Sequence, residues 1–128
     1  MPTARKLLGD SAETMAAARL SRSGMRILAR NQRTSEVAGE IDLIALDGRE
    51  LVFVEVKAQR AGNLAGPERP VLAVGRQKQR KLRALAIAWL RDHDGFVPRH
   101  SGFRFDVVGV RIGRDGEPTE WEHIRHAF

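Results

Sequence analysis

Three carboxylates and a lysine interrupt two hydrophobic runs between residues 40 and 57. Glu40 and Asp42 stand in the first run, and Glu55 and Lys57 stand in the second. Two carboxylates about 5 Å apart repel by about 3 kcal/mol at an effective dielectric of about 20. A raised carboxylate pKa, the ammonium of Lys57 or a bound divalent cation must offset this cost.

Oxygen donors at these positions favour one kind of metal chemistry. The chain has no cysteine, and its four histidines are scattered, so magnesium or manganese suits the site better than zinc. A metal on Asp42 and Glu55 would activate water for attack on a phosphodiester, and Lys57 would position that water or stabilise the developing negative charge. The alternative is a structural salt bridge between an acid and Lys57 on neighbouring strands.

A hairpin must position these residues. Asp47-Gly48 is a strong turn signal between the two runs. A two-residue loop places Glu40 opposite Glu55, and a four-residue loop places Asp42 opposite Glu55. Because side chains alternate along a strand, both registers put the four charged residues on one face. That face is apolar near the turn and charged at its other end, as a pocket at the edge of a core would be.

The remaining elements predict one α/β domain over residues 1–128. Periodicity predicts a first helix within 9–24, with Asp10 as N-cap and Gly24 near its end, and a second helix over 76–92. Strands are expected at 25–31, 103–112 and 119–128, beside the hairpin, and a loop at 61–70. The order is helix, three strands, helix, two strands. It predicts a mixed sheet flanked by helices.

Charge and hydropathy narrow the class of protein. The formal charge is +6, and between Val56 and Arg91 the single acid is Glu68 among many lysines and arginines. This favours a polyanionic partner, although a solvated helix face is the alternative. The first residues lack the apolar core of a signal peptide, and no apolar run is long enough to span a bilayer. We expect a soluble cytoplasmic protein without a membrane partner.

The pattern Asp, then Glu-x-Lys thirteen residues later, resembles the catalytic signature of the PD-(D/E)XK nuclease superfamily. A longer series of motifs resembles the YraN-type family of predicted endonucleases, which is similar to archaeal Holliday junction resolvases. These motifs are Gly9-x-x-x-Glu13, GMRILARNQR, GEIDLIALDG, LVFVEVKAQR, Lys78 and RFDVV. The resemblance implies a restriction-endonuclease-like fold with the element order α-β-β-β-α-β-β.

The resemblance also implies roles by position. Asp42 and Glu55 would be metal-binding carboxylates, Lys57 the catalytic lysine, Glu13 a further metal-site acid and the carbonyl of Val56 a further ligand. Glu13 has an alternative role, because it lies three residues after Asp10, where a capping-box partner belongs. Asp106 either serves the site or holds neighbouring arginines, and it is not part of the predicted catalytic set.

A basic set would contact DNA phosphates beside the cut. Such contacts position DNA without reading its sequence and weaken with salt. Lys78 also falls in line with Leu82, Leu85 and Trp89, so it is an alternative support for the active site. Trp89 is expected in the core. The predicted nucleic-acid-binding residues are Arg60, Arg76, Lys78, Arg80 and Lys81.

The expected function is metal-dependent hydrolysis of DNA phosphodiesters, with Mg²⁺ or Mn²⁺ as cofactor and branched or structured DNA as a candidate substrate. The alternative is a catalytically inactive nucleic-acid-binding or accessory protein on a nuclease scaffold. A third class is a basic domain that binds another protein or ribosomal RNA. The junction-cleaving relatives act as symmetric dimers, so a homodimer is one candidate for the oligomeric state, and the sequence does not decide it.

Overall fold

The computed structural model describes residues 2–62 and 67–128, so part of the expected loop at 61–70 lies outside the described residues. The order of elements is the expected one, with a short 3-10 helix before the second α-helix. The elements are α1 (Ala4–Arg22), β1 (Arg26–Gln32), β2 (Ile41–Asp47), β3 (Glu50–Arg60), η1 (Pro70–Ala73), α2 (Arg76–Asp92), β4 (Gly102–Ile112) and β5 (Pro118–Ile124). The predicted α/β class and the bounds of the second helix are confirmed.

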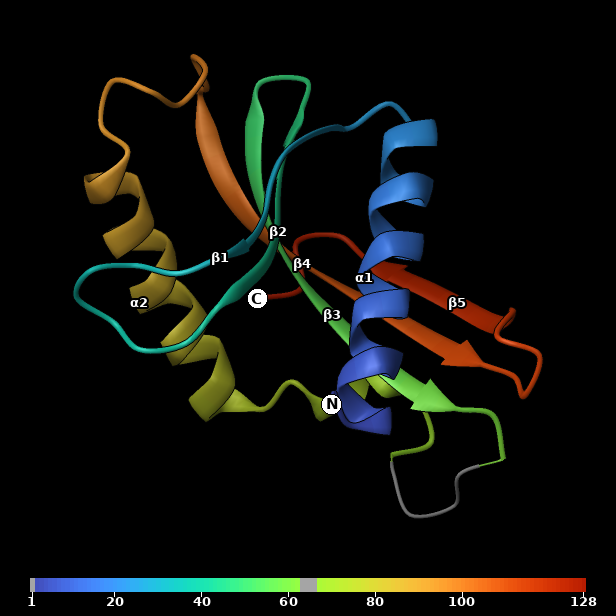
Figure 1. Cartoon of the computed structure of the whole chain (residues 1–128). Coiled ribbons are helices and arrows are strands. Elements are labelled where there is room, and N and C mark those ends of the chain that lie inside the picture. Colours follow the sequence, from blue (N-terminus) through green and yellow to red (C-terminus); the bar gives the residue numbers. More distant parts are fainter. Residues whose placement is uncertain (1, 63–66) are drawn as a thin grey trace.

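The five strands form one mixed sheet in the order β1-β2-β3-β4-β5. Neighbouring strands are antiparallel except for β3 and β4, which run parallel from the pair Glu50↔Gly102 to the pair Arg60↔Ile112. Parallel neighbours need a long crossover connection, and η1 and α2 lie within it. Figure 1 shows α1 and α2 on opposite sides of the sheet.

Each face of the sheet has its own hydrophobic core. Val52 and Val54 of β3 pack in the cluster that includes α1, whereas Leu51 and Phe53 pack in the cluster that includes α2. Trp89 is buried in the second cluster, as expected. Because side chains alternate along a strand, Glu55 and Lys57 leave β3 on the same face as Phe53. The charged residues Glu55 and Lys57 therefore lie at the edge of the hydrophobic core that contains Phe53.

The first helix begins earlier than the sequence predicted. Thr3 is its N-cap, and the hydroxyl of Thr3 accepts a hydrogen bond from the amide of Lys6 at 3.1 Å. The prediction that Asp10 caps the helix was wrong, because Asp10 and Glu13 both lie inside it. Glu13 therefore has no capping-box role. Neither helix in the described part of the chain is both long and apolar enough to cross a membrane.

The hairpin has one of the two expected registers. Leu46 lies opposite Leu51, and one further pair, Asp47↔Glu50, leaves Gly48 and Arg49 as the turn. Gly48 has φ 59°, a left-handed value that glycine adopts without strain. Continuing this register brings Asp42 level with Glu55.

The last strand is shorter than predicted. It ends at Ile124 instead of reaching Phe128. His126 has φ 52° and turns the chain back over β4, where Ala127 donates its amide to the carbonyl of Phe105 at 2.7 Å.

Candidate active site

The candidate site lies where β2 and β3 separate. Their paired register ends at Leu43↔Val54, although β3 continues to Arg60. Just beyond the last pair, Val56 donates its amide to Asp42 Oδ2 at 2.8 Å. A side-chain carboxylate thus accepts the hydrogen bond that a continuing strand would have accepted with its backbone. This bond fixes Asp42 at the point of divergence.

Glu55 is the buried acid of the site and has two lysine neighbours. Its side chain is only 5% exposed. Lys57 Nζ lies 3.3 Å from Glu55 Oε1, and Lys78 Nζ of α2 lies 3.5 Å from the same oxygen. Glu55 Oε2 is buried and has no hydrogen-bond partner among the described residues. One carboxylate oxygen is therefore held by two cations, while the other is left for a further positive group.

Asp42 has an electrostatic environment unlike that of a surface acid. The pKa of Asp42 is raised to about 8, chiefly by burial and then by the negative charges of Glu55 and Glu13. The hydrogen bond from Val56 and the charge of Lys78 act in the opposite direction. Without a bound cation, Asp42 is therefore largely protonated at neutral pH. A cation at this position would favour the ionised form.

Glu13 approaches the site from α1 and is held by β1. Its Oε2 accepts a hydrogen bond of 2.7 Å from Asn31 Nδ2. Asn31 has φ 50°, a left-handed value that asparagine tolerates better than most residues. Glu13 is close enough to Asp42 to act on its pKa. Four elements, α1, β2, β3 and α2, therefore contribute charged side chains to one site.

The donor atoms fit a hard divalent ion held by few protein ligands. In residues 2–62 and 67–128, no three acidic, histidine or cysteine side chains are grouped closely enough to hold a metal. The unpartnered oxygen of Glu55 can accept an added positive charge, and such a charge would offset the burial and the neighbouring acids that raise the pKa of Asp42. Magnesium commonly takes one or two protein carboxylates and keeps several waters. Asp42 and Glu55 fit that pattern, with the Val56 carbonyl and Glu13 as the other predicted donors.

Two acids near these strands serve other partners. Glu40 Oε2 pairs with Arg33 at 2.9 Å, which removes it from the charged cluster. Asp106 is fully buried and accepts hydrogen bonds from Arg104, from His123 and from the amide of His126. Of the two roles considered for Asp106, holding the neighbouring arginine is the one that the structure has.

The comparisons with known proteins place the chain in a family. Residues 12–110 match the family described as "Uncharacterised protein family UPF0102". The chain belongs to this family. A UPF0102 protein of Rhodococcus jostii is 47% identical over 122 residues, covering 94% of this chain and 95% of the relative. Relatives of the same description from Streptomyces griseus (46% identical, 95% of this chain and 96% of the relative) and Anaeromyxobacter dehalogenans (45%, 97% and 85%) are similar along their length.

Most of the basic residues predicted to bind DNA lie at the surface of this UPF0102 protein. Arg60, Arg76, Arg80 and Lys81 are exposed, the last three in the first half of α2. Lys78 is half-buried and its ammonium contacts Glu55. Its position matches the alternative role, support of the active site, more closely than a contact to the DNA backbone.

Three residues of the UPF0102 site region were missed by the sequence analysis. Gln59 follows Glu55 and Lys57 on the same face of β3, so side-chain alternation was a signal for it. Asn31 carries no such signal, because its bond to Glu13 joins residues eighteen positions apart. Arg5 lies in the first turn of α1, before the predicted start of this helix. It lines a cavity together with Lys57 and Gln59.

Proposed function

We propose that this UPF0102 protein is an Mg²⁺- or Mn²⁺-dependent endonuclease of the PD-(D/E)XK superfamily that hydrolyses phosphodiester bonds in branched or otherwise structured DNA. The observation that carries the proposal is the convergence of Asp42, Glu55 and Lys57 where β2 and β3 separate. A structural salt bridge would not need a second acid whose pKa is raised to about 8 beside the first. It would also not leave a buried carboxylate oxygen unpartnered.

Asp42 and Glu55 would hold the metal, with the carbonyl of Val56 as a main-chain ligand and Glu13 on the α1 side. When bound, the ion would polarise the scissile phosphate and lower the pKa of a water molecule. The Val56 amide keeps Asp42 oriented through its hydrogen bond. Lys78 keeps Glu55 in place from α2. These contacts preorganise the two carboxylates before substrate arrives.

Lys57 is the residue that would act on the reacting phosphate. It is partly exposed, and its ammonium lies 3.3 Å from Glu55 Oε1. From this position it can donate a hydrogen bond to a phosphate oxygen as negative charge develops there. Lys57 also lines an open cavity, which is where a substrate strand could approach it.

The positive charge of exposed residues near the site supports DNA as the substrate class. The exposed cations Arg76 and Arg80 lie on the same helix as Lys78, within about one turn of it. Phosphate contacts from such residues are independent of sequence and weaken as salt rises. They would anchor the backbone on either side of the phosphate that reaches Lys57.

A second candidate is the catalytically inactive nucleic-acid-binding or accessory protein. One observation favours it, namely that Asp42, Glu55 and Glu13 are not grouped closely enough to hold a metal by themselves. Both candidates predict DNA binding that weakens with salt. They differ in whether the bound DNA is cut.

The deciding experiment measures nicking of a panel of branched, flapped and duplex DNAs in the presence of Mn²⁺ or Mg²⁺. A calorimetric titration measures Mn²⁺ binding by the same proteins. Asp42→Ala, Glu55→Ala and Lys57→Ala should abolish nicking while circular dichroism shows a folded protein. Glu40→Ala is the matched control, because Glu40 lies two residues from Asp42 and pairs with Arg33 outside the site. Manganese binding without nicking would favour the inactive alternative, and nicking retained in Asp42→Ala would refute the proposal.

A further inference from the structure

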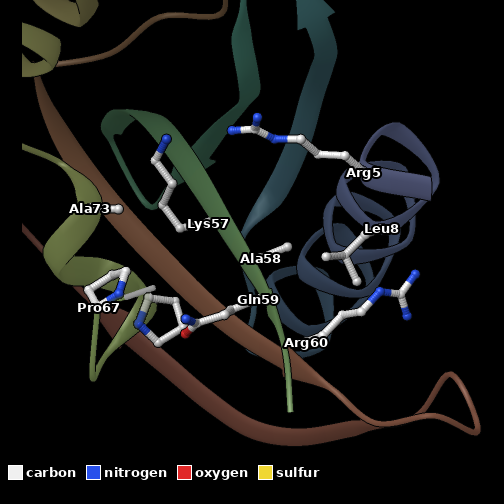
Figure 2. A pocket seen from close by; sticks show the side chains of 9 residues that line it. Arg5, Leu8, Lys57, Ala58, Gln59, Arg60, Pro67 and Ala73 are labelled. Carbon is white, nitrogen blue, oxygen red and sulfur yellow. The ribbon is translucent and has the colours of Figure 1, made fainter. Parts of the chain in front are cut away.

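A cavity of about 480 Å³ lies beside Lys57, along the part of β3 that β2 does not pair. Figure 2 shows β3 passing between α1 on one side and the η1 segment on the other. The heads of Lys57 and Arg5 extend toward the same end of the cavity in this view. The residues that line the cavity are Arg5, Leu8, Lys57, Ala58, Gln59, Arg60, Pro67, Pro70 and Ala73. We call it the edge cavity.

The lining of the edge cavity combines two kinds of surface. Three of its residues are cations, Arg5, Lys57 and Arg60, and no carboxylate of the described part of the chain lines it. Apart from Gln59, its other lining residues are alanine, leucine or proline, and they come from α1, β3 and the chain around η1. A ligand that matches this lining has a negatively charged group and a flat apolar body. A nucleotide has both, and the volume lies within the range of small-ligand sites.

Gln59 adds a polar feature to the wall of the edge cavity. Gln59 is 6% exposed, and its Nε2 and Oε1 atoms are both closed to solvent and lack a hydrogen-bond partner among the described residues. Buried amides are nearly always hydrogen-bonded, because an unpaired one loses its bonds to water without replacement. The edge of a nucleobase carries a donor and an acceptor side by side, which is what a side-chain amide pairs with. A base in the cavity would satisfy both groups once the Gln59 side chain turned toward it, whereas a bare phosphate would satisfy the Nε2 donor alone.

We infer that the edge cavity receives one unstacked nucleotide of the DNA strand being cut, adjacent to the scissile phosphate. The inference rests on the proposed function, which places the scissile phosphate at Lys57. Lys57 belongs both to the acid cluster, through Glu55, and to the cavity lining. Arg5 and Arg60 contact the phosphate next to the cut, and the base lies between the apolar walls. Gln59 turns its buried amide toward the cavity and hydrogen-bonds the edge of that base.

This occupant defines the substrate class more narrowly. A base can enter the cavity only after leaving the duplex stack, and unstacking costs least where the nucleotide is already unpaired. Junction centres, flaps and single-stranded gaps offer such nucleotides, whereas intact duplex does not. The protein should therefore cut at or beside an unpaired nucleotide and leave continuous duplex largely uncut.

The test fills the edge cavity without touching the acids. Ala73 is exposed and lines the cavity, so Ala73→Trp should occupy the space of the base. Leu72→Trp is the matched control, because Leu72 is exposed and does not line the cavity. On a flapped DNA, Ala73→Trp should nick about tenfold or more slowly than the wild type, and Leu72→Trp at the wild-type rate. Removing the base at the captured position, with an abasic nucleotide, should restore nicking by Ala73→Trp. Equal nicking by the two tryptophan variants would overturn the inference and leave the proposed function standing.

A binding measurement separates this inference from the proposed function. With metal removed, an oligonucleotide carrying 2-aminopurine at the unpaired position should brighten on binding wild type and Leu72→Trp, but not Ala73→Trp. Gln59→Leu should weaken this capture, whereas a merely structural glutamine would leave it unchanged. If the wild type nicks nothing but the brightening is seen, the proposed function fails and nucleotide capture stands. If free deoxyadenosine monophosphate competes as well as the oligonucleotide, the cavity takes free nucleotide and the inference is wrong.

Discussion

The amide of Val56 donates to Asp42 Oδ2 at 2.8 Å, across the point where β2 leaves β3. This bond joins the backbone of the strand that carries Glu55 and Lys57 to the side chain of the neighbouring strand. A hydrogen bond from an N–H group favours the ionised carboxylate, yet burial and Glu55 outweigh it and leave the pKa of Asp42 raised. The site is therefore well ordered in geometry but unfavourable in charge, as expected where a cation completes it.

Asp42→Asn should stabilise the metal-free protein, and the gain should depend on pH. The folded-state pKa of Asp42 is raised to about 8 from 3.8, so unfolding releases a proton between these values and stability falls as pH rises. The amide oxygen of asparagine can still accept from Val56 without carrying charge. We expect the free energy of unfolding at pH 8 to increase by about 1–3 kcal/mol, and the difference to vanish near pH 4. Urea unfolding in EDTA at the two pH values measures it.

Glu40→Gln is the control for this effect. Glu40 lies on the same segment and is paired with Arg33 at the surface, so its neutralisation should not stabilise the protein at pH 8. Saturating Mn²⁺ should then stabilise the wild type and leave Asp42→Asn nearly unchanged. A pH-independent gain in Asp42→Asn would mean that burial of the charge is not its cause.

Glu13→Gln should lower the pKa of Asp42 without disturbing α1. Glutamine can still accept from Asn31 through its side-chain oxygen, while the negative charge that raises the pKa of Asp42 is removed. Carboxyl carbon chemical shifts, followed by NMR titration in the absence of metal, report this pKa directly. Asp10→Asn changes an exposed residue of the same helix and should leave the pKa of Asp42 unchanged. An unmoved Asp42 titration in Glu13→Gln would place Glu13 outside the site.

The sequence predicted the charged cluster because its signals are local. Alternation along β3 placed Glu55 and Lys57 on one face, and the Asp47-Gly48 turn limited the register to two choices. The contacts that complete the site cross between elements, and no local signal reports them. Thr3, and not Asp10, is the N-cap of α1. Arg5 therefore lies in a helical turn that the sequence did not predict, and from this turn it lines the edge cavity. Asn31 and Glu13 meet only because β1 passes beside α1.

The variants Lys78→Ala and Arg80→Ala should distinguish two roles, support of the active site by Lys78 and binding of DNA phosphates by Arg80. Lys78 contacts Glu55, whereas Arg80 is exposed on the same helix two residues along. Removing Lys78 should slow nicking about tenfold or more at saturating DNA while leaving the salt dependence of binding unchanged. Removing Arg80 should weaken binding and reduce the slope of log affinity against log salt by about 1. Affinity measured from 50 to 200 mM salt, together with single-turnover nicking, distinguishes the two roles. A salt slope in Arg80→Ala equal to that of the wild type would show that Arg80 does not contact phosphate.

Asp106→Asn should destabilise the fold without removing the chemistry. Asp106 is fully buried, and its pKa is lowered because hydrogen bonds from His123, Arg104 and the His126 amide outweigh the effect of burial. Its contribution to stability is therefore present above the unfolded pKa and is lost as pH falls through the lowered folded value. We expect a loss of about 3 kcal/mol at pH 7, near the lower end for a broken buried pair because Asp47 still pairs with Arg104.

Asp94→Asn is the control for Asp106→Asn, because Asp94 is exposed and its change should stay within about 0.5 kcal/mol. Below about pH 4 the stabilities of the wild type and Asp106→Asn should converge as Asp106 of the wild type becomes protonated. At a temperature where Asp106→Asn is still folded, its manganese affinity and nicking rate should match those of the wild type. If the folded variant no longer bound manganese, Asp106 would have to be part of the active site. That result would contradict the structural role inferred from its hydrogen bonds with Arg104 and His123.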